Sequence, residues 1–194
     1  FGLMGSGRTE LARILFGLDS CEQGEIRVGG KVQSKGTPRQ CIDTGMAFVT
    51  ENRRDEGLLM DISIGDNIGL VSLPRYASST VTPLRENKLN GQVDGVVDSL
   101  KIKASDVRQQ AVKTLSGGNQ QKTVIGKWLL SNPEVLIIDE PTRGVDVGAK
   151  FEIYTIIAQL AAQGTGVLFI SSELEELMGV CNRILVMGNG EVQA

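Results

Sequence analysis

Along most of this chain, short continuous apolar runs alternate with segments in which apolar residues recur every three or four positions. Continuous runs are typical of buried strands, and the wider spacing is typical of helices that bury one face. The alternation predicts an α/β fold with a mostly parallel sheet. The expected strands are 25–28, 46–50, 135–138, 166–170 and 184–187, and the expected helices are 8–16 and a segment from Ala149 that ends at Gly164.

The pattern changes between about residues 61 and 130, which are more polar and mainly helical in spacing. We interpret this stretch as a helical subdomain inserted in a single domain that covers 1–194. Its most loop-like part is 76–90, which is rich in Ser, Thr and Pro. Because the first residue is Phe and it opens a motif, we expect the domain to be truncated, with its N-terminal strands missing.

Composition excludes several classes of function. The net charge is −3, so no basic surface for nucleic acid is indicated. Three scattered cysteines do not suggest disulfides or a zinc site, and favour a reduced, cytosolic setting. The sequence has no His, and no apolar stretch approaches the ~18 residues of a membrane span. If a membrane is involved, a partner chain must cross it.

The first candidate site is the glycine-rich segment that leads into the first helix. Such a loop can direct backbone N–H groups at phosphate oxygens, and the helix dipole adds positive potential. The pattern matches a phosphate loop, except that Arg8 stands where Lys is expected, and Thr9 would be the magnesium ligand. A glycine-rich turn before a helix is also a common structural device. The candidate residues are Gly2, Gly5, Ser6, Gly7, Arg8 and Thr9.

Two adjacent acids end the apolar strand at 135–138. Side chains alternate along a strand, so Asp139 and Glu140 point differently and can take separate roles. Asp139 would hold magnesium and Glu140 would polarise the attacking water. Solvated acids at a strand end are the simpler alternative, but the continuation through 141–146 makes the segment more specific.

The third motif is Leu-Ser-Gly-Gly-Asn-Gln-Gln-Lys at 115–122, which precedes a helix. Ser116 can cap that helix, and Gly117 and Gly118 expose its first N–H groups. This gives the chain a second anion-binding helix terminus. Ser116 lies 23 residues before Asp139 (139 − 116).

These motifs resemble those of ATP-binding cassettes (ABC), the motor domains of ABC transporters. Residues 115–122 resemble the ABC signature, 139–142 the Walker B segment and 144–146 the D-loop. The variant motifs, including Gly-Arg-Thr-Glu at 7–10, narrow the resemblance to the second cassette of ribose-, galactose- and xylose-type importers. The resemblance implies a P-loop NTPase that uses ATP and Mg²⁺ to drive sugar import.

The resemblance also implies how the parts assemble. Two cassettes, fused in one full-length chain, would pair head to tail, so that one cassette's signature contacts ATP held by the other. It also implies a transmembrane permease, docked near 51–73, a periplasmic sugar-binding protein and a place at the cytoplasmic face of the bacterial inner membrane. Residues 57–60 would be an apolar anchor for the permease or part of the core. The implied contacts to the partner's nucleotide are Ser116, Gly117, Gly118, Asn119 and Asp146.

Three positions depart from the family pattern. Arg8 replaces Lys, Glu51 replaces a Gln, and Ser172 replaces the His that senses the γ-phosphate. Glu51 is either a third magnesium ligand or a solvated acid beside two arginines. Ser172 is either a nucleotide contact or, as we favour, the start of a capping box that ends at Glu175. Together they predict an impaired own site beside an intact signature that serves a partner.

Three classes of function remain open. The chain is a transport ATPase, or a nucleotide-dependent binding module without useful turnover, or an ABC ATPase of DNA repair or translation. The last class lacks support, because neither a basic stripe nor long coiled-coil heptads are present. The first two differ in whether this half of the protein hydrolyses ATP.

Overall fold

The computed structural model describes residues 1–3, 5–33, 36–77 and 85–193, which form two compact units. The first unit comprises Phe1–Glu51, Pro133–Pro141 and Ile157–Ala194. The second comprises Asn52–Asn132 and Thr142–Ile156. The chain therefore passes from the first unit to the second after Glu51 and again after Pro141.

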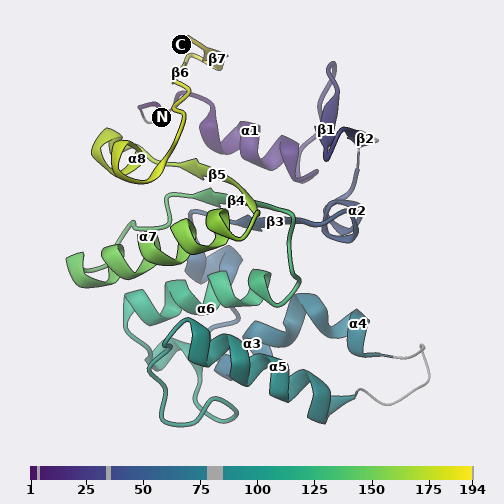
Figure 1. The fold of residues 1–194 in the computed structure, drawn as a ribbon, viewed down its shortest axis with the longest axis vertical. Helices are drawn as coiled ribbons and strands as arrows, with labels where there is room; N and C mark the ends of the chain where they lie inside the picture. The colour runs from purple at the N-terminus through teal and green to yellow at the C-terminus, as the bar shows by residue number, and fades with distance from the viewer. Residues whose placement is uncertain (4, 34–35, 78–84, 194) are drawn as a thin grey trace. The chain divides into compact units, whose positions relative to one another are not determined.

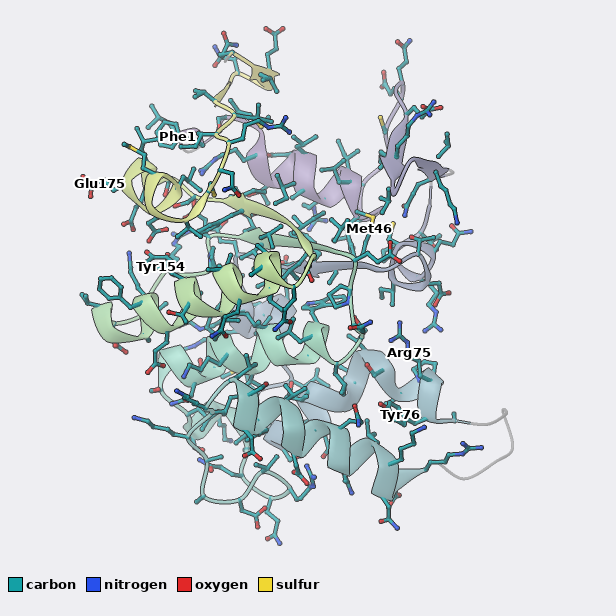
Figure 2. The ribbon with its side chains drawn as sticks, viewed as in Figure 1. Phe1, Met46, Arg75, Tyr76, Tyr154 and Glu175 are labelled. Atoms are coloured by element: carbon teal, nitrogen blue, oxygen red, sulfur yellow. The ribbon has the colours of Figure 1, made fainter. Side chains whose placement is uncertain are left out.

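A three-stranded parallel sheet forms the centre of the first unit (Figure 1). Its order is β3 (Met46–Val49), β4 (Val135–Asp139) and β5 (Gly166–Ile170), with Met46 opposite Val135 and Val135 opposite Gly166. All of β3 and the last four residues of β4 are buried, as expected for parallel strands covered on both faces. Met46 marks the start of β3 in Figure 2.

Short helices and hairpins complete this unit. On α1 (Arg8–Leu15), Ala12 is buried, and the ring centroid of the following Phe16 lies 5.6 Å from that of Phe48 on β3. The other elements are α2 (Pro38–Asp43), α8 (Leu174–Val180), the hairpin β1 (Ile26–Val28) with β2 (Lys31–Gln33), and the hairpin β6 (Met187–Gly188) with β7 (Glu191–Val192). The long helix α7 (Val147–Ala162) begins in the second unit and ends in the first.

The second unit is helical in the part of the chain that the structure describes. Apolar side chains of α3, α5 and α6 form its core, including Ile68, Val93 and Ile125. A Cβ on Gly126 would lie 2.9 Å from Val96 Cγ1, so this glycine lets α6 approach α5 closely. Its elements are η1 (Arg53–Gly57), a π-helical turn, α3 (Ile64–Gly69), η2 (Leu70–Ser72), α4 (Leu73–Tyr76), α5 (Glu86–Ser99), η3 (Val112–Thr114), α6 (Gly117–Leu129) and the first part of α7.

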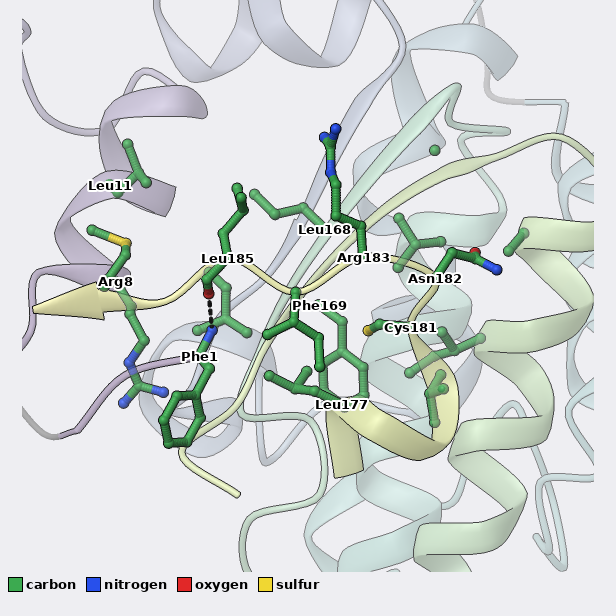
Figure 3. Close-up of a pocket in the computed structure, with 18 of the residues that line it drawn as sticks. Phe1, Arg8, Leu11, Leu168, Phe169, Leu177, Cys181, Asn182, Arg183 and Leu185 are labelled. Atoms are coloured by element: carbon green, nitrogen blue, oxygen red, sulfur yellow. Dashed lines mark hydrogen bonds between the residues drawn. The ribbon is translucent and has the colours of Figure 1, made fainter. Parts of the chain in front are cut away.

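Two sequence predictions about elements are wrong in part. The loop expected over 76–90 ends earlier, because Leu89 begins the buried face of α5 that continues through Val93 and Val97; residues 78–84 lie outside the described part. The strand expected at 184–187 is absent except for Met187. There, the backbone of Phe1 donates to Leu185 O (Figure 3) and accepts from Met187 N, both at 2.8 Å. On the other side Gln193 N donates to Val186 O, also at 2.8 Å. These separate bonds do not make a continuous ladder.

No helix among the described residues is both long and apolar enough to cross a membrane. The expected apolar anchor at 57–60 divides between core and surface: Leu58 is 6% exposed, whereas Leu59 is 49% exposed.

A buried lysine joins α6 to η1 in the second unit. Lys127 is 7% exposed, donates from Nζ to Gly57 O, and lies 5.5 Å from the ring centroid of Trp128. Burial lowers its pKa from 10.5 to about 8, because the charged ammonium group loses hydration there.

This shift predicts that stability rises with alkaline pH. Between about pH 8 and 10.5 the unfolded chain binds the proton that native Lys127 has released, so the free energy of unfolding increases with pH. Urea unfolding across this range measures it. Lys127→Met should lose the rise, and parallel profiles for the two proteins would contradict the assignment.

Candidate functional site

The glycine-rich loop of the first unit has the backbone that its sequence predicts. Gly5 and Gly7 have φ of 78° and 91°, in the left-handed region that favours glycine. Gly7 is the N-cap of α1 and, having no side chain, offers no side-chain acceptor to the first N–H groups of the helix. A Cβ on Gly2 would collide with Ser6 Oγ, so Gly2 makes room for that hydroxyl. The loop therefore presents backbone donors at a helix N-terminus.

Two buried oxygen atoms at this loop have no hydrogen-bond partner among the residues that the structure describes. They are Ser6 Oγ and Asp139 Oδ1, and the parent residues are 5% and 1% exposed. Thr9 Oγ1 donates to the other oxygen of Asp139, Oδ2, at 2.7 Å. Burial raises the pKa of Asp139, while the Thr9 hydrogen bond opposes that shift. A buried carboxylate oxygen without a partner costs free energy unless a ligand or ion satisfies it.

The donor set fits Mg²⁺. Hydroxyl and carboxylate oxygens are its preferred ligands, and it is usually bound by one or two carboxylates together with substrate phosphates. Glu51 and Ser172 follow β3 and β5, so they share the carboxyl edge of the sheet with Asp139. Among the described residues, however, no three Cys, Asp or Glu side chains are grouped to hold a metal ion. Thr9 and Asp139 are thus brought together, and Glu51 as a ligand stays a prediction.

The structure pairs two residues for which the sequence predicted different roles. Arg8 Nη1 lies 3.1 Å from Glu140 Oε1, and their side chains are only 10% and 11% exposed. Glu140 has φ of 46°, which is uncommon for a residue other than glycine. Nothing in the sequence indicates this ion pair except opposite charge, because the partners are 132 positions apart. In this structure the predicted phosphate-binding cation and the predicted catalytic carboxylate neutralise each other.

The capping role predicted for Ser116 is confirmed in the second unit. Ser116 is the N-cap of α6, and its Oγ accepts from Asn119 N at 3.4 Å and from Asn119 Nδ2 at 3.0 Å. The adjacent glycines have a second role that the sequence did not indicate. A Cβ on Gly117 would lie 3.0 Å from Gly144 O, and one on Gly118 would lie 2.5 Å from Ala149 Cβ. They let α6 pack directly on the 142–149 segment.

Asp146 has a structural partner in the same segment. Its Oδ1 accepts from Ala149 N at 2.9 Å, in the first turn of α7. The carboxylate therefore fixes the turn by which the predicted D-loop enters α7.

The capping box predicted to begin at Ser172 is wrong. Glu173 is the N-cap of α8 and makes no side-chain cap bond. Ser171 acts one residue earlier, where its Oγ accepts from Glu173 N and donates to Glu176 Oε2, both at 2.9 Å. The reason is burial: Ser171 is fully buried after β5 and satisfies its hydroxyl locally, whereas Ser172 is exposed. A nucleotide contact at Ser172 stays a prediction.

A pocket of about 460 Å³ lies beside β5 in the first unit (Figure 3). Its lining is mainly apolar, with Phe1, Leu168, Phe169 and Leu177 around it. Burial also raises the pKa of Cys181 at its wall. Such a lining suits apolar groups rather than phosphate.

Comparison with known proteins agrees with this geometry. A family model described as "ABC transporter" matches residues 1–143. The chain is therefore a member of the ABC transporter family, with the P-loop NTPase fold. Two solved structures share this fold: a nucleotide-free ATP-binding cassette from an ABC transporter (TM-score 0.85, 22% identity, all of this chain and 77% of that one) and a dimeric cassette bound to ADP and phosphate (0.83, 19%, all of this chain and 81% of that one).

Curated relatives point to one group within this family, the ribose import ATP-binding proteins. The chain is 47% identical over 192 residues to the ribose import ATP-binding protein RbsA of Bacillus subtilis and 46% identical over 191 residues to RbsA 1 of Rubrobacter xylanophilus. Each alignment covers 98% of this chain but 38% of the relative. The chain thus spans less than half the length of these relatives, as one cassette of a two-cassette protein would.

Proposed function

We propose that this chain is the second ATP-binding cassette of a bacterial monosaccharide importer, a single ABC domain that couples ATP binding and hydrolysis to sugar uptake. The observation that carries the proposal is the convergence of the glycine loop, Thr9 and Asp139 around unpartnered buried oxygens. The names of the ribose-import relatives support the substrate class. The partners would be another cassette, a transmembrane permease and, indirectly, a periplasmic binding protein, at the cytoplasmic face of the membrane.

In the proposed site each residue has a separate task. The amides of the glycine loop and Arg8 bind phosphate oxygens, while Thr9 and Asp139 hold Mg²⁺, with Glu51 as a further candidate ligand. The ion would neutralise charge on the β- and γ-phosphates. Glu140 would accept a hydrogen bond from the attacking water. The signature and D-loop residues Ser116, Gly117, Gly118, Asn119 and Asp146 would serve the partner's nucleotide.

The proposal includes an impaired own site. The guanidinium of Arg8 is a planar fork, larger than the compact ammonium group of Lys. In this structure it also forms an ion pair with Glu140. To use both residues, the site must break that pair. The same observation favours a second candidate function, a nucleotide-dependent module that holds the dimer without turnover of its own.

Calorimetric titration of the complete protein with Mg-ATP tests the proposal. Asp139→Asn is expected to reduce the number of nucleotides bound from two to one, because it removes the buried magnesium ligand of this cassette. Arg8→Ala should weaken the same site. Arg39 is an exposed residue of α2, so Arg39→Ala is a control that should bind as the wild type. Unchanged stoichiometry and affinity in Asp139→Asn would overturn the assignment of this site.

A further inference from the structure

Arg53 lies in η1, the π-helical turn that begins two residues after Glu51. The turn is fixed at its start by Asn52, whose Oδ1 accepts from Asp55 N. At its end, Gly57 O accepts from Lys127 Nζ on α6. A Cβ on Gly57 would lie 3.2 Å from Val124 Cγ2, so the turn also packs on α6. Arg53 therefore projects from a base that is held against the signature helix.

The guanidinium of Arg53 binds two successive carbonyl groups where the chain enters the predicted D-loop (144–146). Its Nη1 donates to Arg143 O at 2.8 Å and its Nη2 to Gly144 O at 3.2 Å. The partners are 90 and 91 positions away in the sequence. Gly144 has φ of 67°, a conformation that favours glycine. The planar fork of Arg can meet two neighbouring acceptors at once, which the point charge of Lys cannot.

The same guanidinium touches the start of α6. A Cβ on Gly117 would lie 3.1 Å from Arg53 Nη2, next to its close approach to Gly144 O. The Nε atom of Arg53 is buried and has no hydrogen-bond partner among the described residues. Burial lowers the pKa of Arg53. Arg53 is thus half-buried, with its guanidinium at the junction of η1, the 143–144 segment and the first turn of α6.

We propose that Arg53 is a positioning residue that locks the 143–146 loop to the first turn of α6, so that both present their groups to a partner's nucleotide in one fixed arrangement. The inference rests on the proposed function, in which Ser116–Asn119 and Asp146 contact that nucleotide. The positive charge of Arg53 also adds to the dipole at the N-terminus of α6, and both favour a bound anion. The chain enters the second unit after Glu51 and again after Pro141. The hydrogen bond from Arg53 to Arg143 O connects these two entering segments within that unit.

The test compares Arg53→Gln, Arg53→Lys and Arg54→Gln in the complete protein. Arg54 is the exposed neighbour of Arg53 and serves as the matched control. Amide hydrogen exchange reports on the loop directly, and steady-state ATPase kinetics report on its use. Arg53→Gln should speed exchange in 142–149 and 116–119 and lower kcat on the order of tenfold, with KM little changed. Arg53→Lys should recover part of both effects, and Arg54→Gln should match the wild type.

Several outcomes would overturn the inference. Unchanged exchange in both segments would mean that Arg53 does not hold them. Faster exchange throughout the second unit would mean that it only supports the fold. Faster exchange in these two segments with unchanged kcat would mean that Arg53 holds them in place but that this does not matter for ATP hydrolysis. If these results occur in a protein that binds and hydrolyses Mg-ATP, the proposed function survives; a wild-type protein without Mg-ATP binding would overturn both.

Discussion

Ser116→Ala in the complete protein is expected to lower steady-state ATP hydrolysis by roughly 10²-fold, the usual effect of removing a donor that stabilises transition-state charge. Arg8→Ala is expected to lower it by less than about tenfold. The reason for this order is the proposed asymmetry. Ser116 would act on the stronger site, built on the other cassette's phosphate loop. Arg8 would act only on this chain's own site, where it is already paired with Glu140.

Loss of a helix cap needs a control, because Ser116 also caps α6. Replacing a capping Ser or Thr by Ala costs about 1 kcal/mol of stability. Thr37→Ala removes the comparable cap of α2 and should leave ATP hydrolysis unchanged. ATPase assays of the three variants measure the order of effects. If Arg8→Ala proved more damaging than Ser116→Ala, the asymmetric assignment would be wrong.

Gly118→Ala is expected to destabilise the protein by about 1–3 kcal/mol, the usual cost of overpacking. The added methyl group would lie 2.5 Å from Ala149 Cβ, and neither atom belongs to a flexible side-chain end. The first turn of α6 must therefore move away from α7. Since that turn carries the signature, ATP hydrolysis should fall together with stability.

A second glycine supplies the matched control in the same unit. Gly95 lies within α5 and has no atom within 4 Å of an added Cβ. Gly95→Ala should therefore stabilise the protein by about 0.5–1 kcal/mol through helix propensity. Urea unfolding of both variants measures whether each substitution raises or lowers the free energy of unfolding. Equal effects for the two substitutions would show that packing at Gly118 does not limit the approach of α6.

Local chemistry made several features predictable from the sequence. A glycine-rich segment before an amphipathic helix predicted the loop and α1, and the apolar run before Asp139 predicted β4. Ser116 was predictable as a cap because a cap depends on the next three residues only. The ABC family could be predicted for the same reason, since its motifs are short and their order along the chain is readable.

Predictions from the sequence were wrong where two neighbouring residues could take the same role. Ser171 and Ser172 have the same side chain, and the pattern S-x-x-E selected Ser172. The end of β5 decided otherwise, because it buries Ser171 and leaves Ser172 exposed. Similarly, the polar composition around Glu86 suggested a loop, while packing of Leu89 and Val93 made it a helix.

The sequence by itself thus determined the fold class and the family, because the motifs that indicate them are made of residues close together in the chain. Only the tertiary structure decided how the charges are used. The pair of Arg8 with Glu140 and the hold of Arg53 on Gly144 O join residues 132 and 91 positions apart. For Arg8 and Glu140 the physical reason is burial, because taking charged groups out of water makes a partner necessary. In both cases the fold, not the local sequence, determines which partner lies within reach.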